Sequence, residues 1–340
     1  MPAPNPLLGL DGMAALRDRI EQRIVAATET PDPELTEMTS HLVRAGGKRL
    51  RPVLAALTSI VGTGAKPDEE AGAGLSLDRV GDDAVTGGVA CELVHVGSLH
   101  HDDVLDEATT RHNVPSVNAR WGNLRAIISG DFLLARASEL AASLGTDVAQ
   151  LLAATIGRLC VGEVQELRVA YQVDRSEEAY TTAIAGKTAA LYETACRIGA
   201  MVGGSPPEDI EAIGAYGLAY GMAFQVVDDV LDVVATDDEL GKPAGHDMVE
   251  GVYNLPVLRA LAGPDGDQLR GLLGGPLDDD ARRKALDIVR AGPGVASAVA
   301  TARAYVDEAI GALASLPPGP VVDALGDAAR HLVAPFADQA

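Results

Sequence analysis

The sequence predicts an all-α protein, and two observations carry that prediction. Apolar residues recur at spacings of three and four almost continuously between Gly and Pro breaks, which is the period of a buried helix face. Alternation of apolar and polar residues, which a half-buried strand would show, is not sustained anywhere. The expected helices cover approximately residues 12–28, 33–45, 51–62, 84–110, 119–144, 147–172, 176–202, 208–236, 250–262, 279–291, 294–315 and 319–337.

Several of these helices begin with residues that favour a helix N-terminus. Ser176 precedes two glutamates, so a hydroxyl can cap the helix while acids stand in its first turn. The segment PPED at 206–209 places proline and acids at the start of the next helix. That helix is apolar over most of its surface and contains glycines that allow a neighbour to approach closely. We expect it to lie in the interior.

The chain of 340 residues is expected to form one domain, because no linker shows a large shift in composition. Apart from two aspartate motifs there is no convincing internal repeat. Segment 62–83 and the segment that starts at Gly263 are rich in Gly and acids and are typical of surface connections. The motifs described below occupy about 40–260, and amphipathic helices without further chemistry fill 265–340.

Composition excludes several classes of partner. With 27 basic and 49 acidic residues the net charge is −22, which disfavours nucleic acid and anionic lipid surfaces. The first residues do not resemble a secretory signal, and no window of eighteen uncharged apolar residues is present, so we expect no transmembrane segment. The 3 cysteines are odd in number and lie in apolar segments, which indicates buried packing residues in a reduced, cytoplasmic protein.

Three aspartates share one face of the helix predicted at 84–110. At about 100° per residue, Asp102, Asp106 and Asp103 project near 0°, 40° and 100°, and His95 lies only about 20° from Asp102. One such cluster would more often be a solvated helix face. A second cluster of identical spacing, Asp228, Asp229 and Asp232, makes that interpretation less attractive.

Both clusters lie inside apolar helices, where unpaired carboxylates are costly to desolvate. Shared divalent cations resolve that cost, and oxygen ligands in a partly hydrated site favour Mg²⁺ over zinc. Mg²⁺ held in this way takes further ligands from water and from substrate phosphates. The sequence therefore predicts a magnesium site that binds a phosphorylated substrate.

Basic residues that could meet phosphate are concentrated at 46–52, GGKRLRP, in an otherwise acidic chain. The segment lacks the spacing of a P-loop, and its basic residues could simply complement a helix end. Lys187, Thr188, Gln225 and Lys242 are individually weak candidates, but each lies on or just after an element that could face the aspartates.

Taken together, GGKRLRP, HDDVLDEATTR, GKT, FQVVDDVLD and GKPAGHDMVEG, in this order, resemble the trans-isoprenyl diphosphate synthase (polyprenyl synthetase) family. The resemblance spans roughly residues 40–260. It implies long helices around a deep central cavity, a homodimer, and condensation of isopentenyl diphosphate with an allylic diphosphate to give a longer trans allylic diphosphate. No nucleophilic residue is required for that reaction.

The resemblance also implies roles for individual residues. About three Mg²⁺ ions, with Mn²⁺ as an alternative, would bridge the allylic diphosphate to the six aspartates. The residues implied to surround that diphosphate are Arg111, Lys187, Thr188, Gln225 and Lys242. Those implied to hold isopentenyl diphosphate are Lys48, Arg51 and His95. The implied catalytic residues are Asp102, Asp103, Asp106, Lys187, Asp228 and Asp229, and Asp232 is implied as a further metal ligand.

Three positions depart from the family pattern. His112 stands where a second arginine is common, followed by Asn113 in place of glycine, and Val252 stands where short-chain relatives often have lysine. Histidine loses its charge near neutral pH whereas arginine does not, so the departures bear on the strength of isopentenyl diphosphate binding.

Product length in such a family depends on side chains one to two turns before the first aspartate. Val94, Gly97 and Ser98 occupy that region here, and none is aromatic. The absence of a bulky side chain favours a long product, heptaprenyl-like or thereabouts, and predicts that Gly97→Phe shortens it. Alternatively, Gly97 only permits close helix packing.

Four other interpretations are open at this stage. One is a short-chain synthase that makes farnesyl or geranylgeranyl diphosphate. A class I terpene cyclase would normally carry a different second metal motif. A non-catalytic subunit of a heteromeric synthase would be expected to lack one or both aspartate motifs. A calcium-binding protein would need a D-x-D-x-D-G loop, which is absent.

Overall fold

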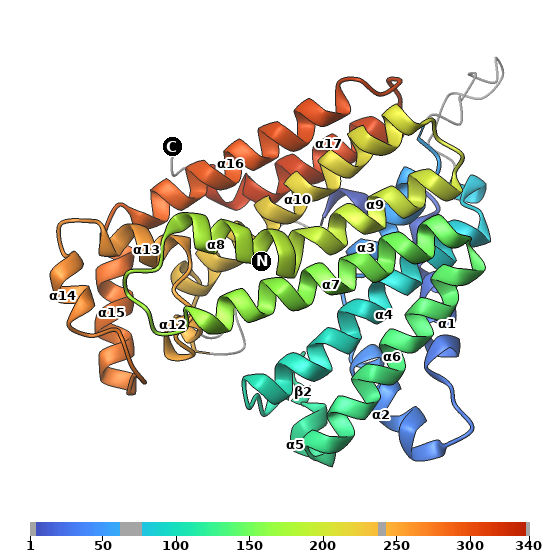
Figure 1. Ribbon diagram of the computed structural model, residues 1–340. Helices are drawn as coiled ribbons and strands as arrows, with labels where there is room; N and C mark the ends of the chain where they lie inside the picture. The colour runs from blue at the N-terminus through green and yellow to red at the C-terminus, as the bar shows by residue number, and fades with distance from the viewer. Residues whose placement is uncertain (1–4, 62–76, 237–242, 338–340) are drawn as a thin grey trace.

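The computed structural model describes residues 5–61, 77–236 and 243–337, and this part of the chain is helical apart from one small hairpin (Figure 1). The N-terminal helices are α1 (Met13–Thr28), α2 (Pro33–Arg44), α3 (Leu50–Thr58), α4 (Asp82–Leu105), α5 (Val117–Trp121) and α6 (Asn123–Ser143). The central ones are α7 (Thr146–Arg168), α8 (Glu177–Ile184), α9 (Ala190–Val202) and α10 (Pro207–Val234). The C-terminal ones are α12 (His246–Val249), α13 (Leu255–Leu261), α14 (Gly266–Arg270), α15 (Asp279–Ala291), α16 (Gly294–Leu313) and α17 (Pro320–Val333). Short 3₁₀ turns lie at Pro6–Gly9, Leu77–Arg79 and Ala334–Phe336. The all-α prediction is confirmed.

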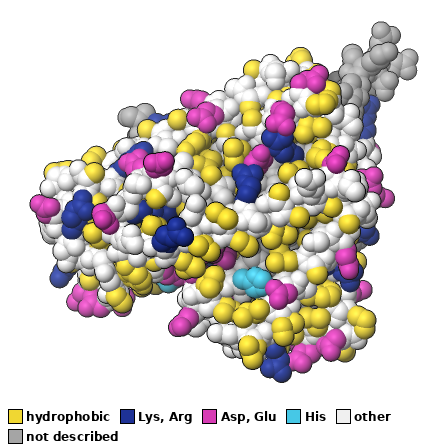
Figure 2. All heavy atoms as spheres, viewed as in Figure 1, with side chains coloured by type: hydrophobic (Ala, Val, Ile, Leu, Met, Phe, Trp, Pro, Cys, Tyr) yellow, Lys and Arg dark blue, Asp and Glu magenta, His cyan; other side chains and the backbone are white. Residues whose placement is uncertain are grey.

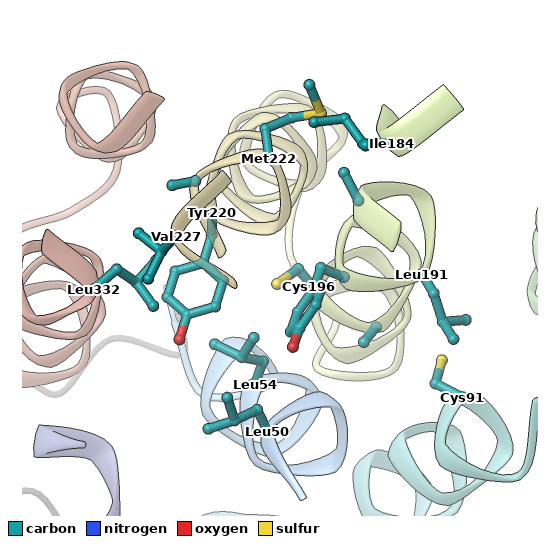
Figure 3. Close-up of a cluster of buried hydrophobic side chains, with 14 of the residues drawn as sticks. Leu50, Leu54, Cys91, Ile184, Leu191, Cys196, Tyr220, Met222, Val227 and Leu332 are labelled. Atoms are coloured by element: carbon teal, nitrogen blue, oxygen red, sulfur yellow. The ribbon is translucent and has the colours of Figure 1, made fainter. Parts of the chain in front are cut away.

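The long helix α10 lies at the centre, packed against α9 on one side and against α16 and α17 on the other (Figure 1). Its start matches the sequence prediction, since Pro207 and two acids form the first turn. A Cβ atom added at Gly221 would lie 2.6 Å from the Cα of Ala189, so glycine is required for this close approach to the preceding segment. Figure 3 shows side chains of α3, α9, α10 and α17 meeting in the core.

Helix α4, which carries the first aspartate motif, packs between α6 and the pair α3 and α9. It contains buried glycine, alanine and valine over most of its length, so it can be surrounded on nearly every side. At Gly88 an added Cβ would lie 2.7 Å from the Cα of Pro52 on α3. The two helices that bear the basic segment and the aspartates are therefore in direct contact.

The helix predicted at 84–110 is too long at its C-terminal end. Helix α4 ends at Leu105, and Glu107 adopts a left-handed conformation (φ 51°) that turns the chain away. A two-stranded antiparallel hairpin follows, with β1 (Thr110–Arg111) paired to β2 (Val114–Pro115). His112 and Asn113 form its turn at φ 49° and 63°, a mirror-image turn that asparagine tolerates well. No sustained alternation marks strands of two residues, which is why the pattern missed them.

Other predicted boundaries also change. The helix predicted at 119–144 is divided at Gly122, and the one at 176–202 contains a π-helical turn, Ala185–Ala189. Helix α13 begins at Leu255 rather than at 250, and the short helices α12 and α14 were not predicted. The single-domain organisation stays a prediction.

Cys91 and Cys196 are buried, but Cys160 is exposed on α7, so the prediction of three buried cysteines is wrong at that position. Within the described ranges, only α10 is long and apolar enough to cross a membrane by length and composition. Because 61% of its most apolar window is buried inside the protein, it is accounted for as a core helix.

Candidate active site

The first aspartate motif lies at the C-terminal end of α4. Asp103 is 0% exposed, and Arg111 of the hairpin holds one of its oxygens with Nε and Nη2 at 2.8 and 2.7 Å. Its other oxygen, Oδ2, is buried and has no hydrogen-bond partner among the described residues. Burial raises the pKa of the Asp103 carboxyl, and the Arg111 charge opposes that rise. The hairpin thus holds Arg111 against the first motif.

Asp102 and Asp106 lie on the partly open side of the same turn. Asp106 is the residue that caps α4, and its amide still donates to the carbonyl of Asp102, so the helical spacing of the motif is kept. Burial raises the pKa of Asp102 to about 7, while the charge of Lys187 acts in the opposite direction. A second cation near Asp102 would therefore be favourable.

Lys187 projects from the π-helical turn towards the first motif. Its Nζ atom lies 2.8 Å from a carboxylate oxygen of Glu163 and 2.8 Å from one of Glu166, both on α7. Burial alone would lower the pKa of Lys187, but Glu166 and Glu163 outweigh it and keep the ammonium charged. Lys187 is a fixed cation beside the aspartates.

The next residue, Thr188, reaches the second motif instead. Its hydroxyl donates to Gln225 Oε1 at 2.7 Å, and Gln225 Nε2 donates to Asp229 Oδ1 at 2.8 Å. A π-helical turn holds one extra residue and changes the directions of successive side chains. From one turn of helix, the charge of Lys187 therefore acts on Asp102 of the first motif, while Thr188 reaches Asp229 of the second motif through Gln225.

Tyr180 of α8 completes the surroundings of the second motif. Its hydroxyl donates to Asp229 Oδ2 at 2.5 Å, and both residues are nearly inaccessible to solvent. Burial raises the pKa of Asp229, and nearby Asp247 raises it further. Asp232 is also buried and accepts a hydrogen bond from the backbone amide of Asp247 at 3.4 Å, whereas Asp228 is exposed.

The basic segment forms a separate corner of the site, next to α4. Arg51 stacks on the ring of Tyr192 at 4.5 Å, and the exposed Lys48 lies over the ring of Phe224 at 5.9 Å. Burial lowers the pKa of His95 well below its usual value, and the nearby Arg51 charge lowers it further. His95 is therefore a neutral hydrogen-bonding group among cations.

The described carboxylates suit Mg²⁺ chemically. They supply hard oxygen ligands, several are desolvated, and Asp103 keeps one buried oxygen without a partner. Among the described residues no group of three or more acidic, His or Cys side chains is arranged to hold a metal ion by itself. This fits ions that take most of their ligands from water and a diphosphate.

The residues proposed to gauge product length are not equivalent. A Cβ at Gly97 would lie 3.1 Å from the carbonyl oxygen of Gly130 and 3.3 Å from Leu133 Cβ, so Gly97 faces α6. Val94 is fully buried, and the Ser98 hydroxyl donates to the carbonyl of His95 at 2.9 Å. The close contact of Gly97 with α6 matches the helix-packing alternative, so Gly97→Phe would first disturb that packing. Lys242 lies outside the described residues.

Sequence reasoning did not single out Tyr180, Glu163, Glu166 or Asp247. Each acts through a residue far away in the chain, and a single sequence does not show such pairings. Only Asp247 had a local signal, because it lies within the quoted GKPAGHDMVEG segment.

Comparisons with known proteins show which family the chain resembles. The family model "Polyprenyl synthetase" matches residues 32–290. The chain is 39% identical to the nonaprenyl diphosphate synthase of Mycobacterium tuberculosis, over 89% of this chain and 87% of the relative. It is 34% identical to the heptaprenyl diphosphate synthase component 2 of Geobacillus stearothermophilus, over 95% of both chains.

The solved structures agree as well. The crystal structure of heptaprenyl diphosphate synthase from Staphylococcus aureus superposes with a TM-score of 0.86 at 28% identity, over 94% of this chain and 98% of that one. Short-chain and geranylgeranyl enzymes are also among the similar proteins. The helical architecture, the two aspartate motifs with their cations, and these matches lead to one conclusion: the chain belongs to the polyprenyl synthetase family of trans-prenyltransferases.

Proposed function

We propose that this protein condenses isopentenyl diphosphate with an allylic diphosphate to give an all-trans polyprenyl diphosphate longer than geranylgeranyl. The observation that carries the proposal is the placement of Lys187 and Thr188 on one π-helical turn: the charge of Lys187 acts on Asp102 of the first motif, and Thr188 reaches Asp229 of the second through Gln225. A separate corner with Lys48, Arg51 and His95 then offers a place for a second diphosphate. Two neighbouring sites that each bind a diphosphate suit a reaction between two diphosphate esters.

The first motif and the second motif would together hold Mg²⁺, with Mn²⁺ as an alternative. When bound, the ions supply positive charge that stabilises the departing diphosphate. Lys187 and Arg111 are held in place by carboxylates, so they can add fixed positive charge without reorganising. Ionisation of the allylic C–O bond then needs no protein nucleophile, and buried apolar side chains on α4, α9 and α10 would help to exclude water from the carbocation.

On the other side of the site, Lys48 and Arg51 would bind the diphosphate of isopentenyl diphosphate. Arg51 can present donors while its guanidinium plane rests on Tyr192. Neutral His95 would donate one hydrogen bond to the same group, because burial and neighbouring cations disfavour its protonated form. The alkene carbon of isopentenyl diphosphate attacks the carbocation, and loss of a proton completes the longer chain.

Two observations support a product longer than geranylgeranyl. The first relatives compared are a nonaprenyl and a heptaprenyl synthase, and the turns before the first motif hold Val94 and Ser98 rather than aromatic side chains. Figure 3 shows that Cys91, about one turn before Val94 on α4, points towards Leu191 of α9. The short-chain alternative predicts products that stop at farnesyl or geranylgeranyl.

A product assay tests the reaction directly. Purified protein is incubated with farnesyl diphosphate, radiolabelled isopentenyl diphosphate and Mg²⁺, with and without chelator, and the dephosphorylated products are separated by length. We expect chelator-sensitive elongation beyond the geranylgeranyl product. Elongation that stops at geranylgeranyl would favour the short-chain alternative, and absence of any elongation would favour a non-catalytic subunit.

We further propose that the protein is a homodimer that uses α6 and α7 as its interface, and that it works in the cytoplasm. Large hydrophobic side chains are exposed on these two helices, and Figure 2 shows hydrophobic atoms gathered on this face. They are Leu124, Ile127, Ile128, Val161, Val164 and Leu167. A second copy would cover this face, whereas the name of the Geobacillus relative, component 2, raises a different subunit as the alternative.

Light scattering coupled to size-exclusion chromatography tests the dimer. Ile128, which is 58% exposed, is replaced by Glu, and the exposed Ala291 on α15 is replaced in the same way as a control. We expect Ile128→Glu to halve the mass and Ala291→Glu to leave it unchanged. A monomeric wild-type protein would contradict the proposal.

A further inference from the structure

One arginine of the basic segment points away from the others. The Arg49 side chain is 2% exposed, although the neighbouring Lys48 is exposed. Its guanidinium bonds to Glu21 Oε1 at 2.7 Å, to Glu92 Oε1 at 3.1 Å and to the carbonyl oxygen of Val43 at 2.8 Å. These partners belong to α1, α4 and α2, so Arg49 joins three helices beneath the segment.

The backbone of Arg49 is also unusual. It adopts φ 51° and ψ 38°, the left-handed region that residues with a side chain rarely occupy, immediately before α3. Such a conformation persists when surrounding contacts over-determine it. The hydrogen bonds of the guanidinium to three residues supply that constraint. Because Lys48 and Arg51 flank this residue, the direction in which each of them leaves the chain depends on it.

Glu92 connects Arg49 to the chemistry of α4. It is 3% exposed, lies about one helical turn before His95, and its Oε2 atom is buried without a hydrogen-bond partner among the described residues. A desolvated carboxylate with so few partners is costly unless a cation stays beside it. Arg49 is the cation that bonds to it, so the basic segment is held to the helix that carries His95.

We propose that Arg49, held by Glu92 and Glu21, is a positioning residue for the isopentenyl diphosphate corner. It does not touch substrate; it fixes Lys48 and Arg51 relative to His95. The inference rests on the proposed function of those three residues. A displacement of about 1 Å at a binding group can cost on the order of 100-fold, so loss of the network has a measurable effect on substrate binding.

The test uses variants that keep the fold. Replacing a buried ion pair by apolar residues of similar size is often neutral for stability, so Arg49→Met is combined with Glu92→Leu. Arg49→Lys keeps the charge but loses the planar donors that reach several partners. Arg197→Lys is the matched control, because Arg197 also binds two glutamates, Glu193 and Glu211, but lies on α9 away from the corner.

KM for isopentenyl diphosphate, KM for the allylic diphosphate and the thermal unfolding midpoint are measured for each variant. We expect the double variant to raise KM for isopentenyl diphosphate by roughly 10- to 100-fold, with a smaller rise for Arg49→Lys. KM for the allylic substrate stays within about 3-fold, because its binding groups belong to other elements. Arg197→Lys leaves both KM values unchanged.

Lys48→Ala distinguishes a failure of the positioning role of Arg49 from a failure of the proposed isopentenyl diphosphate site. If it raises KM for isopentenyl diphosphate while folded Arg49 variants do not, Arg49 is not a positioning residue and the proposed function stands. If both KM values rise together in the Arg49 variants, the effect is general and the inference is overturned. If Lys48→Ala leaves KM for isopentenyl diphosphate unchanged, the corner is misassigned and the inference fails with it.

Discussion

Replacing Tyr180 by Phe removes one hydroxyl from beside the second aspartate motif and leaves the ring in place. The hydroxyl donates to Asp229 Oδ2 at 2.5 Å, and Gln225 is then the one side chain still bonded to Asp229 in the described structure. A hydrogen bond to a charged group contributes about 1.5–3 kcal/mol, and about 1.4 kcal/mol corresponds to a tenfold change in binding. The loss therefore weakens metal binding by roughly 10- to 100-fold.

The direction follows from the protonation of Asp229. Burial already raises its pKa, and the Tyr180 hydroxyl opposes that rise by bonding to the carboxylate. Without the hydroxyl the neutral carboxyl is more favoured, so a metal ion has to displace a proton more often. We expect the Mg²⁺ concentration for half-maximal activity to rise, with partial rescue at higher Mg²⁺.

The assay is a Mg²⁺ titration of initial rates, with thermal unfolding measured in parallel. Tyr216→Phe is the control, because Tyr216 is equally buried and donates at 2.9 Å to the neutral carbonyl of Leu325, on α17. That variant is expected to lose stability without a change in Mg²⁺ dependence. If Tyr180→Phe shows the wild-type Mg²⁺ titration, Tyr180 does not tune the metal site and the reasoning fails.

The remaining predictions concern other parts of the site. Asp102→Ala and Asp228→Ala should each lower kcat at least 10²–10³-fold, and turnover near wild type would refute the metal assignment. His112→Arg should lower KM for isopentenyl diphosphate by about tenfold, since burial and Arg111 lower the pKa of His112 and leave it mostly uncharged; an unchanged or higher KM would contradict this. The pKa of His95 is lowered in the folded state, so the unfolded state binds a proton more readily. The contribution of His95 to the free energy of unfolding is therefore complete above about pH 6.5 and falls by about 1.4 kcal/mol for each pH unit below about 6.5. His100 is also buried with a lowered pKa and contributes in both proteins, so chemical denaturation between pH 5 and 8 should show a steeper slope for wild type than for His95→Gln, and parallel curves would contradict this.

Periodic patterning was sufficient for most of the fold. The helices at 279–291 and 33–45 were predicted almost to the residue, because their apolar faces and caps are local in sequence. The pattern failed where tertiary contacts decide the backbone. Nothing between 105 and 115 alternates long enough to show a strand, yet the hairpin forms because Arg111 bonds to Asp103. Likewise, the π-helical turn at Ala185–Ala189 is not visible as a change of period.

In the site, too, local features could be predicted from the sequence, whereas features set by tertiary contacts could not. The two aspartate motifs could be found from sequence, since their spacing fixes which carboxylates share a helix face and their apolar flanks make unpaired charges costly. The orientation of Gly97 could not, because its direction depends on which neighbour α4 meets, and that neighbour is α6. Cys160 is a similar case: the apolar pattern predicted that it is buried, but the packing of α7 leaves it exposed.

By itself the sequence determined the helical class, the two aspartate motifs and the family, because each depends on residues close together in the chain. The tertiary structure alone decided which distant groups complete them. Tyr180 meets Asp229, Glu163 and Glu166 hold Lys187, and Arg49 binds Glu92. Such pairs form only when helices pack, since their partners are separated by tens of residues and no local pattern links them.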